Sequence, residues 1–180
     1  MPDARVERTR AALTAAVLKL LETRDFSAVT IGEIVEAAGI GYATFFRHYK
    51  DKEELLLDAA DRLTDALLPD ILPALASDDT AEAALAICRH IERNASAFQA
   101  LLTAAAEPTV QRLMIEQRIA WAHGVGLPDP PGLPPDLAIT HTVHAAQALL
   151  TWWLQRGRDM PAEEMAAILD RLVLSPVRKG

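Results

Sequence analysis

The stretch from Thr30 to Leu55, TIGEIVEAAGIGYATFFRHYKDKEEL, limits the possible folds of this 180-residue chain more than any other stretch. Thr30 is a favourable N-cap, and Glu33 follows three residues later, so the two side chains predict a reciprocal capping box. Apolar residues then recur at helical spacing as far as Gly39, where a left-handed residue can end the helix at little cost. The stretch therefore predicts a short helix over residues 31–38, followed by a tight turn.

A second helix is expected to begin within two or three residues of this turn, because residues 42–49 contain no helix breaker. Phe45 and Tyr49 lie four positions apart and are expected to face inward together. Asp51 can cap the helix that follows. Two short helices joined by a glycine-containing turn are typical of a helix-turn-helix, whose second helix can enter the major groove of DNA. The pattern alone also fits an ordinary corner between two helices of a helical protein.

The stretch resembles the TetR (tetracycline-repressor-like) family of transcriptional regulators, closely over residues 13–55 and only in architecture beyond. The resemblance implies an all-α fold of about nine helices. Residues 1–65 would form a three-helix helix-turn-helix DNA-binding domain with the start of a connecting helix, and residues 66–180 a helical bundle for ligand binding and dimerisation. The residues that carry the resemblance are Phe26, Thr30, Ile31, Ile34, Ala37, Ala38, Gly39, Ile40, Thr44, Phe45, Phe46, His48, Tyr49, Lys52, Glu54 and Leu55.

The resemblance also implies a set of DNA contacts. Thr30 and Lys52 are expected to hold phosphates, each at a helix N-terminus. Three positions depart from the family pattern: Gly41 replaces a frequent Ser, Tyr42 a polar or basic residue, and Phe46 a Tyr whose hydroxyl would reach a phosphate. Tyr42 can offer either its ring to a thymine methyl or its hydroxyl to a base edge or phosphate. The expected DNA-binding residues are Thr30, Gly41, Tyr42, Ala43, Thr44, Phe46, Arg47, His48 and Lys52.

The net charge of −7 at first sight argues against a nucleic-acid partner. The basic side chains of the N-terminal part are nevertheless clustered, and a two-fold dimer would double their local charge. We therefore expect modest non-specific affinity that weakens steeply with salt. The clustered residues are Arg5, Arg8 and Arg10 at the start, and Arg47, Lys50 and Lys52 at the end of the predicted recognition segment.

The remaining chain is rich in apolar residues and poor in glycine, which favours a mainly helical interior. Pro69 and Pro73 are expected to break or kink the chain, with a loop over 74–79 and a frayed tail over 175–180. Ser96 with Gln99 predicts a second capping box, and Asp136 a cap. Further helices are expected over residues 2–23, 51–68, 80–93, 96–106, 108–124, 136–156 and 161–174, with a proline-rich loop over 124–135.

Two apolar clusters suggest further roles. Residues between the middle helices predict a small-molecule pocket, although the same spacing also fits plain core. Apolar residues near the C-terminus exceed what one helix face needs, and they resemble the dimer-forming helices of the family; a helix at the centre of a monomer is the alternative. The expected pocket residues are Phe98, Leu101, Leu102, Met114, Trp121 and His144, and the expected dimer interface comprises Leu149, Trp152, Trp153, Met165, Ile168, Leu169 and Leu172.

Neither a metal, a cofactor nor an enzymatic activity is expected. His141 and His144 can share a helix face, but no H-E-x-x-H, glycine-rich phosphate loop or G-x-S-x-G occurs. Cys88 is the single cysteine, so no internal disulfide can form. The apolar run over 149–154 is too short to span a membrane, and the charged start lacks the apolar core of a signal peptide. These features indicate a cytoplasmic protein.

The function that these expectations favour is a sequence-specific transcriptional regulator, in the role of a ligand-responsive repressor. It would bind a palindromic operator in double-stranded DNA as a homodimer, with a small-molecule effector and no membrane partner. The alternative is a helical protein that binds a small molecule or a partner and retains weak or vestigial DNA binding. Gly41, Phe46 and the net acidity motivate this alternative.

Overall fold

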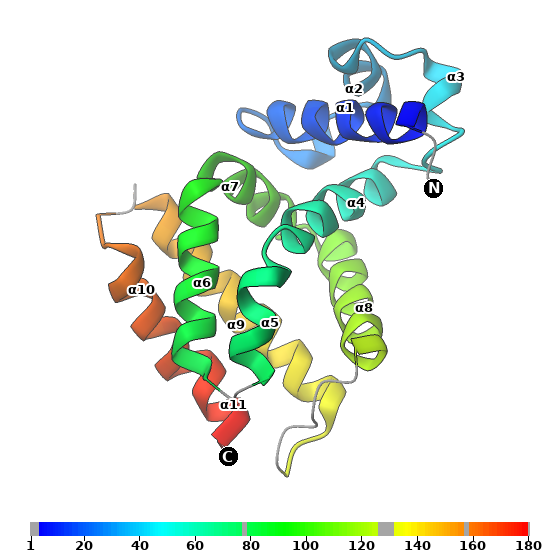
Figure 1. Cartoon of the computed structure of the whole chain (residues 1–180). Coiled ribbons are helices and arrows are strands. Elements are labelled where there is room, and N and C mark those ends of the chain that lie inside the picture. The colour runs from blue at the N-terminus through cyan, green and yellow to red at the C-terminus, as the bar shows by residue number, and fades with distance from the viewer. Residues whose placement is uncertain (1–3, 77–78, 126–131, 157–158, 180) are drawn as a thin grey trace. The chain divides into compact units, whose positions relative to one another are not determined.

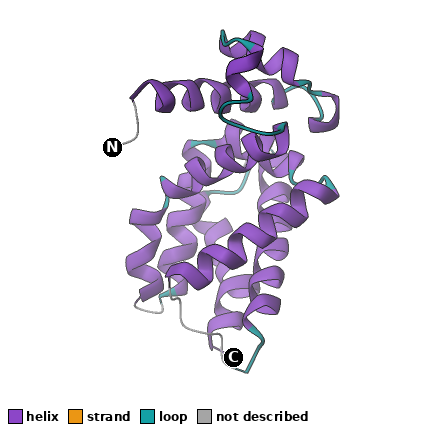
Figure 2. Cartoon of the chain, turned by 90° about the vertical axis from the view of Figure 1, so that its right-hand side faces the viewer, coloured by secondary structure: helices purple, strands orange, loops and turns teal. Residues whose placement is uncertain are grey.

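The computed structural model describes residues 4–76, 79–125, 132–156 and 159–179. Every regular element in these ranges is helical, which confirms the predicted all-α fold (Figures 1 and 2). The chain divides into two compact units. Met1–Thr64 and Ser96–Val110 form the first unit, and Asp65–Ala95 and Gln111–Gly180 form the second. The assignment of residues 1–65 and 66–180 to separate functions stays a prediction.

The first unit begins with α1 (Ala4–Leu21), which buries an apolar stripe that includes Leu13 and Val17. α1 ends before the predicted residue 23, because the amides of Glu22 and Thr23 donate to carbonyls three residues back and so form a turn. Phe26 then lies buried in the short helix η1 (Phe26–Ala28). Residues 2 and 3 lie outside the described residues.

α2 (Ile31–Ala38) has the predicted bounds and the predicted capping box. The amide of Glu33 donates to the Thr30 hydroxyl over 3.3 Å, and the amide of Thr30 donates to the Glu33 carboxylate over 2.9 Å. Gly39 ends the helix with a φ of 66°, a conformation that glycine adopts without steric cost. The turn of the helix-turn-helix is thus built as the sequence predicts.

α3 (Tyr42–Phe45) is shorter than the predicted helix over 42–49. The amides of Arg47 and His48 donate to carbonyls three residues back, so the chain tightens into turns after Phe45. Phe45 and Tyr49 both face the core, as predicted. Asp51 caps α4 (Lys52–Asp65) by accepting from the amide of Glu54 over 2.7 Å.

α4 ends at Asp65 instead of continuing to residue 68. Pro69 explains the difference, because a proline in a continuous helix clashes with the carbonyl four residues back, here that of Asp65. A separate helix, α5 (Leu68–Ala76), starts instead, and it carries Pro69 in its first turn and Pro73 inside. Residues 74–76 are therefore helical where a loop was predicted, and 77–78 lie outside the described residues.

The second unit is organised around α6 (Thr80–Arg93), whose bounds are as predicted. α6 packs against α5 and against α10 (Ala162–Leu169), and Figure 1 shows it between them. Ala83, Ala84 and Cys88 are buried on α6, and such small side chains allow close helix approach. α9 (Pro135–Gln155) contributes buried Trp153, whose indole N–H donates to the Met160 carbonyl over 2.8 Å.

Three predicted helix ends are wrong for local reasons. α7 (Ala95–Ala104) starts directly after Asn94, so Ser96 lies inside the helix and forms no N-cap. α9 starts at Pro135, which places Asp136 in the first turn instead of at the cap. The predicted tail is largely helical, because a π-helical turn, η2 (Asp170–Leu174), leads into α11 (Ser175–Lys179).

α8 (Pro108–Val125) begins at the predicted proline and ends close to the predicted residue 124. The predicted loop over 124–135 lies mostly outside the described residues. Among the helices that the structure describes, none is long and apolar enough to cross a bilayer.

Candidate DNA-contacting surface

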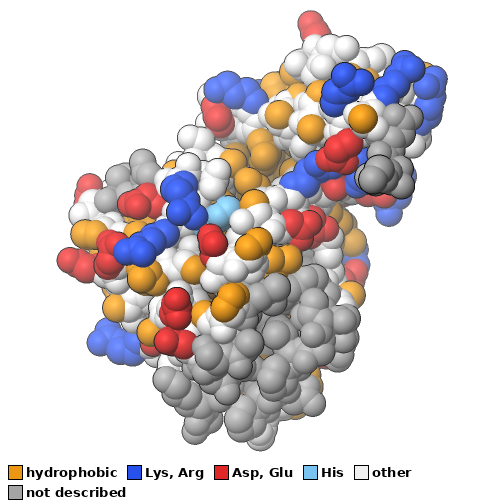
Figure 3. Space-filling view, viewed as in Figure 1, with side chains coloured by type: hydrophobic (Ala, Val, Ile, Leu, Met, Phe, Trp, Pro, Cys, Tyr) orange, Lys and Arg blue, Asp and Glu red, His pale blue; other side chains and the backbone are white. Residues whose placement is uncertain are grey.

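The predicted contact residues between Gly41 and His48 lie together on the outer side of the first unit. Gly41, Tyr42, Ala43, Phe46 and Arg47 are exposed, whereas Thr44 and His48 are half-buried. The buried Phe45 fixes this segment to the core of the unit. We call residues 41–48 the recognition segment. Figure 3 shows Lys and Arg side chains gathered at the end of the first unit that carries α3.

Thr30 lies exposed at the N-terminus of α2, but its hydroxyl is already used. It accepts from the amide of Glu33 and donates to the Glu33 carboxylate over 2.7 Å. Arg24 pairs with the same carboxylate. The hydrogen bonds from Arg24 first, and then from Thr30, lower the pKa of Glu33 to about 2. A phosphate at this helix end would therefore meet a carboxylate neighbour, and the phosphate role of Thr30 stays a prediction.

Lys52 also has partners within the chain. Its ammonium donates to the carbonyl oxygens of Phe26 over 2.7 Å and Val29 over 2.9 Å, with a longer contact of 3.3 Å to Ser27. The same ammonium lies 4.6 Å from the centre of the Phe26 ring. Lysine has three N–H donors, and these three contacts occupy them. Lys52 thus ties the start of α4 to the η1 turn, and its phosphate role stays a prediction.

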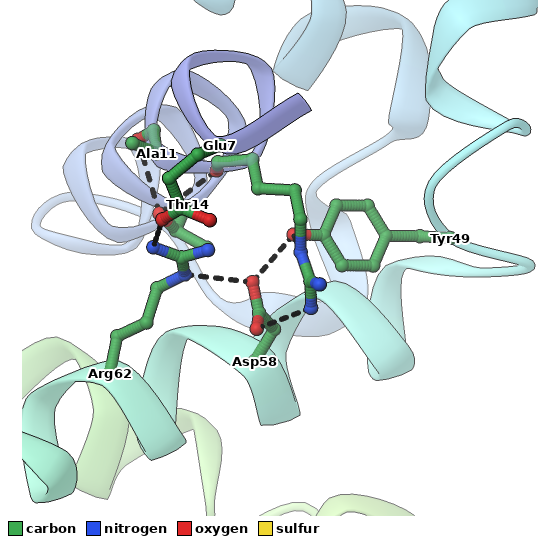
Figure 4. Close-up of polar contacts among 7 residues, drawn as sticks. Glu7, Ala11, Thr14, Tyr49, Asp58 and Arg62 are labelled. Carbon is green, nitrogen blue, oxygen red and sulfur yellow. Dashed lines mark hydrogen bonds and ion pairs between the residues drawn. The ribbon is translucent and has the colours of Figure 1, made fainter. Parts of the chain in front are cut away.

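A polar network joins three parts of the first unit (Figure 4). Asp58 on α4 accepts from the hydroxyl of Tyr49 over 2.6 Å, from Arg10 on α1 over 2.7 Å, and from Arg62 over 3.0 Å. Arg10 also donates to the Tyr49 hydroxyl over 3.3 Å, and Arg62 pairs with Glu7. The network therefore connects α1 and α4 to the residue that follows the recognition segment.

The network shifts the ionisation of its members. Burial raises the pKa of Asp58, but the hydrogen bonds from Tyr49 and Arg62 and the charges of Arg62 and Arg10 outweigh burial, so the pKa is lowered overall. Burial first, and then the hydrogen bond to Asp58, raises the pKa of Tyr49 to about 12. Asp58 is thus held as an anion and Tyr49 as a neutral donor at physiological pH.

Sequence reasoning missed this network. It placed Arg10 in the basic cluster of the N-terminal part and expected Tyr49 to face inward with Phe45. The ring of Tyr49 is indeed buried, but its hydroxyl needs a partner there, as buried phenols usually do. Buried polar ends such as this one are the signal that could have pointed to Asp58.

The predicted pocket residues are split between the two units. Phe98, Leu101 and Leu102 belong to the first unit, and Met114, Trp121 and His144 belong to the second. Phe98 and Leu101 are buried, Leu102 and Met114 are half-buried, and His144 is exposed. The side chain of Trp121 lies outside the described residues. The pocket stays a prediction.

A different hollow of about 680 Å³ lies within the first unit, between the α1–η1 turn and α7. Its walls are largely polar, and none of the six predicted pocket residues is among its described lining residues. The lining comprises Leu21, Glu22, Thr23, Arg24, Asp25, Ala28, Ser96, Gln99, Ala100 and Thr103.

The predicted dimer residues separate into two groups in the second unit. Trp153, Met165 and Leu169 are buried in their own chain, so in this conformation they offer no surface to a partner. Their role in a dimer interface stays a prediction. Trp152 and Leu172 are 42% and 53% exposed, and the remaining two residues, Leu149 and Ile168, are half-buried.

Metal-ligating side chains are not grouped in the described part of the chain: no three His, Cys, Asp or Glu residues there could share an ion. His141 and His144 are exposed on α9, while Cys88 and His90 are buried on α6. Burial first, and then the charge of Glu92, raises the pKa of the Cys88 thiol to about 12.

Comparison with known proteins places the recognition segment in context. Residues 13–59 match the sequence model of the bacterial regulatory proteins of the tetR family. An uncharacterized HTH-type transcriptional regulator, YxbF of Bacillus subtilis (strain 168), is 39% identical over 90 residues. This match covers 47% of the chain but 24% of YxbF, so the chain spans about a quarter of that relative's length.

Solved structures resemble the chain over nearly its whole length. A TetR transcriptional regulator from Streptococcus agalactiae 2603V is similar with a TM-score of 0.62 and 21% identity, covering 96% of this chain and 97% of that one. NalD, the secondary repressor of the MexAB-OprM multidrug efflux pump in Pseudomonas aeruginosa, is similar with a TM-score of 0.60 and 18% identity, covering 97% of each chain. At these identities the likeness shows the fold alone.

Proposed function

Because this chain belongs to the TetR family of bacterial transcriptional regulators, we propose that it represses transcription by binding a palindromic DNA operator as a homodimer. A small-molecule effector would control this binding in the cytoplasm. The observation that carries the proposal is the recognition segment, whose exposed side chains project from a buried anchor, Phe45.

The recognition segment has the chemistry that a base-reading surface needs. Gly41 and Ala43 are small and exposed, so the backbone can approach a groove closely. Thr44 and His48 supply hydrogen-bonding groups for base edges, and Arg47 supplies a positive charge. Thr30 and Lys52 have a smaller part in this proposal than the sequence suggested, since both already hold partners within the chain.

Dimerisation through the second unit would present two recognition segments to one duplex. Two-fold related helix-turn-helix segments read half-sites one helical turn, about 34–36 Å, or a multiple of it, apart. Trp152 and Leu172 support this role because both are large, apolar and exposed. Burying the exposed half of such a side chain between copies would stabilise a dimer by about 1 kcal/mol each.

The effector would act by differential affinity. A ligand shifts the equilibrium between a DNA-competent and a DNA-incompetent state only as far as it binds one state better than the other. α4 follows the helix-turn-helix directly in the chain and is therefore the element through which such a shift would reach it.

Selection of bound fragments from random duplex DNA tests the central proposal. We expect an inverted repeat to be enriched, and we expect Thr44→Ala to weaken binding to it while the far-UV spectrum is unchanged. Gln155→Ala, at an exposed position at the end of α9, serves as the control. No enrichment, or equal affinity of Thr44→Ala and the control, would reject the assignment.

Dimerisation needs its own measurement. Sedimentation equilibrium should show a dimer for the wild type and a monomer for Leu172→Glu, because the new charge would be buried between copies. A monomeric wild type at micromolar concentration would refute this part.

A second function is favoured by one observation, the engagement of Lys52 with its own carbonyl groups. In that reading the second unit binds a small molecule or partner, and DNA binding is vestigial. Titration with salt separates the two, since operator binding through phosphates must weaken as salt rises. An absence of any salt-dependent binding to duplex DNA would support the second reading.

A further inference from the structure

Two aromatic rings stand exposed side by side on the recognition segment. Tyr42 is 56% exposed and Phe46 is 47% exposed, and their ring centres lie 5.2 Å apart at an interplanar angle of 62°. Phe46 also meets the buried ring of Phe45 edge-on, with centres 5.3 Å apart. The pair is therefore held in one arrangement by a ring that belongs to the core.

Folding of the first unit does not require this pair to be apolar. The core position of the segment is filled by Phe45, whereas the side chains of Tyr42 and Phe46 are about half exposed. Two adjacent exposed aromatic rings form an apolar patch of the kind that marks an interaction site. The position of the pair within residues 41–48 makes it part of the candidate DNA surface.

The residues around the pair indicate which group of the DNA the two rings would contact. Gly41 and Ala43 leave room beside Tyr42, and Arg47 follows Phe46 as an exposed cation suited to a phosphate. Phe46 has no polar side-chain atom, so at a base edge its ring offers apolar contact and no hydrogen bond. The apolar group that B-DNA displays in its major groove is the C5-methyl of thymine.

We propose that Tyr42 and Phe46 act together as an apolar reader of thymine, selecting operator half-sites by the C5-methyl group beneath the two rings. The inference rests on the proposed DNA-binding function and adds the base that the site prefers. It chooses the ring of Tyr42, not its hydroxyl, as the group that confers this preference.

Replacement of thymine by deoxyuridine tests the proposal directly, because it removes the methyl group and keeps the base pair. Each thymine of the selected half-site is replaced in turn, and affinity is measured by fluorescence anisotropy. At one or two positions we expect affinity to fall about fourfold, the effect of removing one buried methyl-sized group. A thymine in the flanking DNA is the matched control and should show no change.

Protein variants then assign the effect to the rings. In Phe46→Ala and Tyr42→Ala, the ratio of affinities for thymine and deoxyuridine should approach one at the sensitive positions. Tyr42→Phe should keep the ratio of the wild type, because it keeps the ring. Both residues are exposed, so circular dichroism is expected to show an unchanged fold in all three variants.

The outcomes separate the two proposals. DNA binding that is insensitive to deoxyuridine at every thymine would overturn the methyl reader while leaving the regulator intact. Equal thymine preference in the wild type and in both alanine variants would do the same. A preference lost in Tyr42→Phe as well would assign recognition to the hydroxyl and so overturn the role of the rings. Failure to select any DNA would overturn the regulator and the reader together.

Discussion

Tyr49 donates its phenolic proton to Asp58 over 2.6 Å and thereby joins the end of the recognition segment to α4. Arg10 contacts both partners from α1, so the carboxylate of Asp58 joins α1, α4 and the segment that follows α3 (Figure 4). A movement of α4 would therefore also shift Tyr49, the residue next to the recognition segment. This arrangement makes Asp58 the centre of the network, so its removal should weaken the links among Arg10, Tyr49 and Arg62.

Asp58→Asn is expected to lower the free energy of unfolding by roughly 1–3 kcal/mol, because it removes the carboxylate that pairs with Arg10 and one of the two carboxylates that pair with Arg62. Tyr49→Phe should cost less, about 1 kcal/mol, since it removes the hydrogen bond to Asp58 and the longer one from Arg10 but leaves the ion pairs of Asp58 in place. Urea melts followed by circular dichroism give both values. Arg112→Ala breaks the exposed pair with Glu116 and should change stability by less than about 1 kcal/mol. Similar values for Asp58→Asn and Arg112→Ala would contradict a structural role of the network.

The lowered pKa of Asp58 determines the pH below which Asp58 no longer stabilises the fold. Because the folded pKa lies below the ordinary value, the stability that Asp58 contributes is fully present above pH of about 4 and is lost as pH falls through the folded pKa. Urea midpoints measured between pH 6 and pH 3 should therefore fall more steeply in the wild type than in Asp58→Asn. Parallel curves would argue against an ionised Asp58 in the fold.

Tyr49 provides a spectroscopic check at the alkaline end. The chain has two tyrosines, so Tyr42→Phe leaves Tyr49 as the single phenol. Its absorbance near 295 nm should titrate with a midpoint of about 12, because burial first and Asp58 second raise its pKa. Because the pKa of Tyr49 is raised, the stability that its neutral hydroxyl contributes is fully present below pH of about 10 and is lost as pH rises toward 12. Adding Asp58→Asn should move the midpoint down while circular dichroism reports an intact fold; an unmoved midpoint would remove Asp58 as a cause.

Cys88 reports opening of the second unit. It is the single cysteine, it is fully buried on α6, and burial raises the pKa of its thiol to about 12. The thiolate is the reactive form, so the native protein at pH 8 should react with a disulfide reagent far more slowly than the urea-unfolded chain. Rapid stoichiometric reaction of the native protein would show that α6 is not packed against α5 and α10 as described.

The sequence predicted the parts of this fold that depend on near neighbours. Thr30, Glu33 and Gly39 lie within ten residues of one another, and their capping and turn chemistry is local. Contacts between distant residues were not predicted: Arg10 and Asp58 lie 48 positions apart, and Lys52 meets carbonyl groups 23 to 26 positions away. Trp152 and Trp153 are a further example. Helical spacing predicts that the two side chains point in different directions, but it does not predict which of them the chain itself buries.

Lys52 and Lys50 form the most informative pair for the DNA contacts, because they are two positions apart in different surroundings. The Lys52 ammonium ties α4 to the η1 turn, so Lys52→Ala should lower the free energy of unfolding by roughly 1.5–3 kcal/mol, the range for hydrogen bonds to a charged group. Lys50 is exposed, and its alanine variant should leave stability unchanged.

On DNA the order should reverse: Lys50→Ala should change binding, and Lys52→Ala should not change its salt dependence. Lys50→Ala should weaken binding to all duplexes and reduce the slope of log affinity against log salt by about one, as expected when one phosphate contact is lost. Lys52→Ala should leave this slope unchanged at temperatures where the variant stays folded. A slope reduced only in Lys52→Ala would mean that the ammonium leaves its carbonyl partners and holds a phosphate in the complex, as the family resemblance implied.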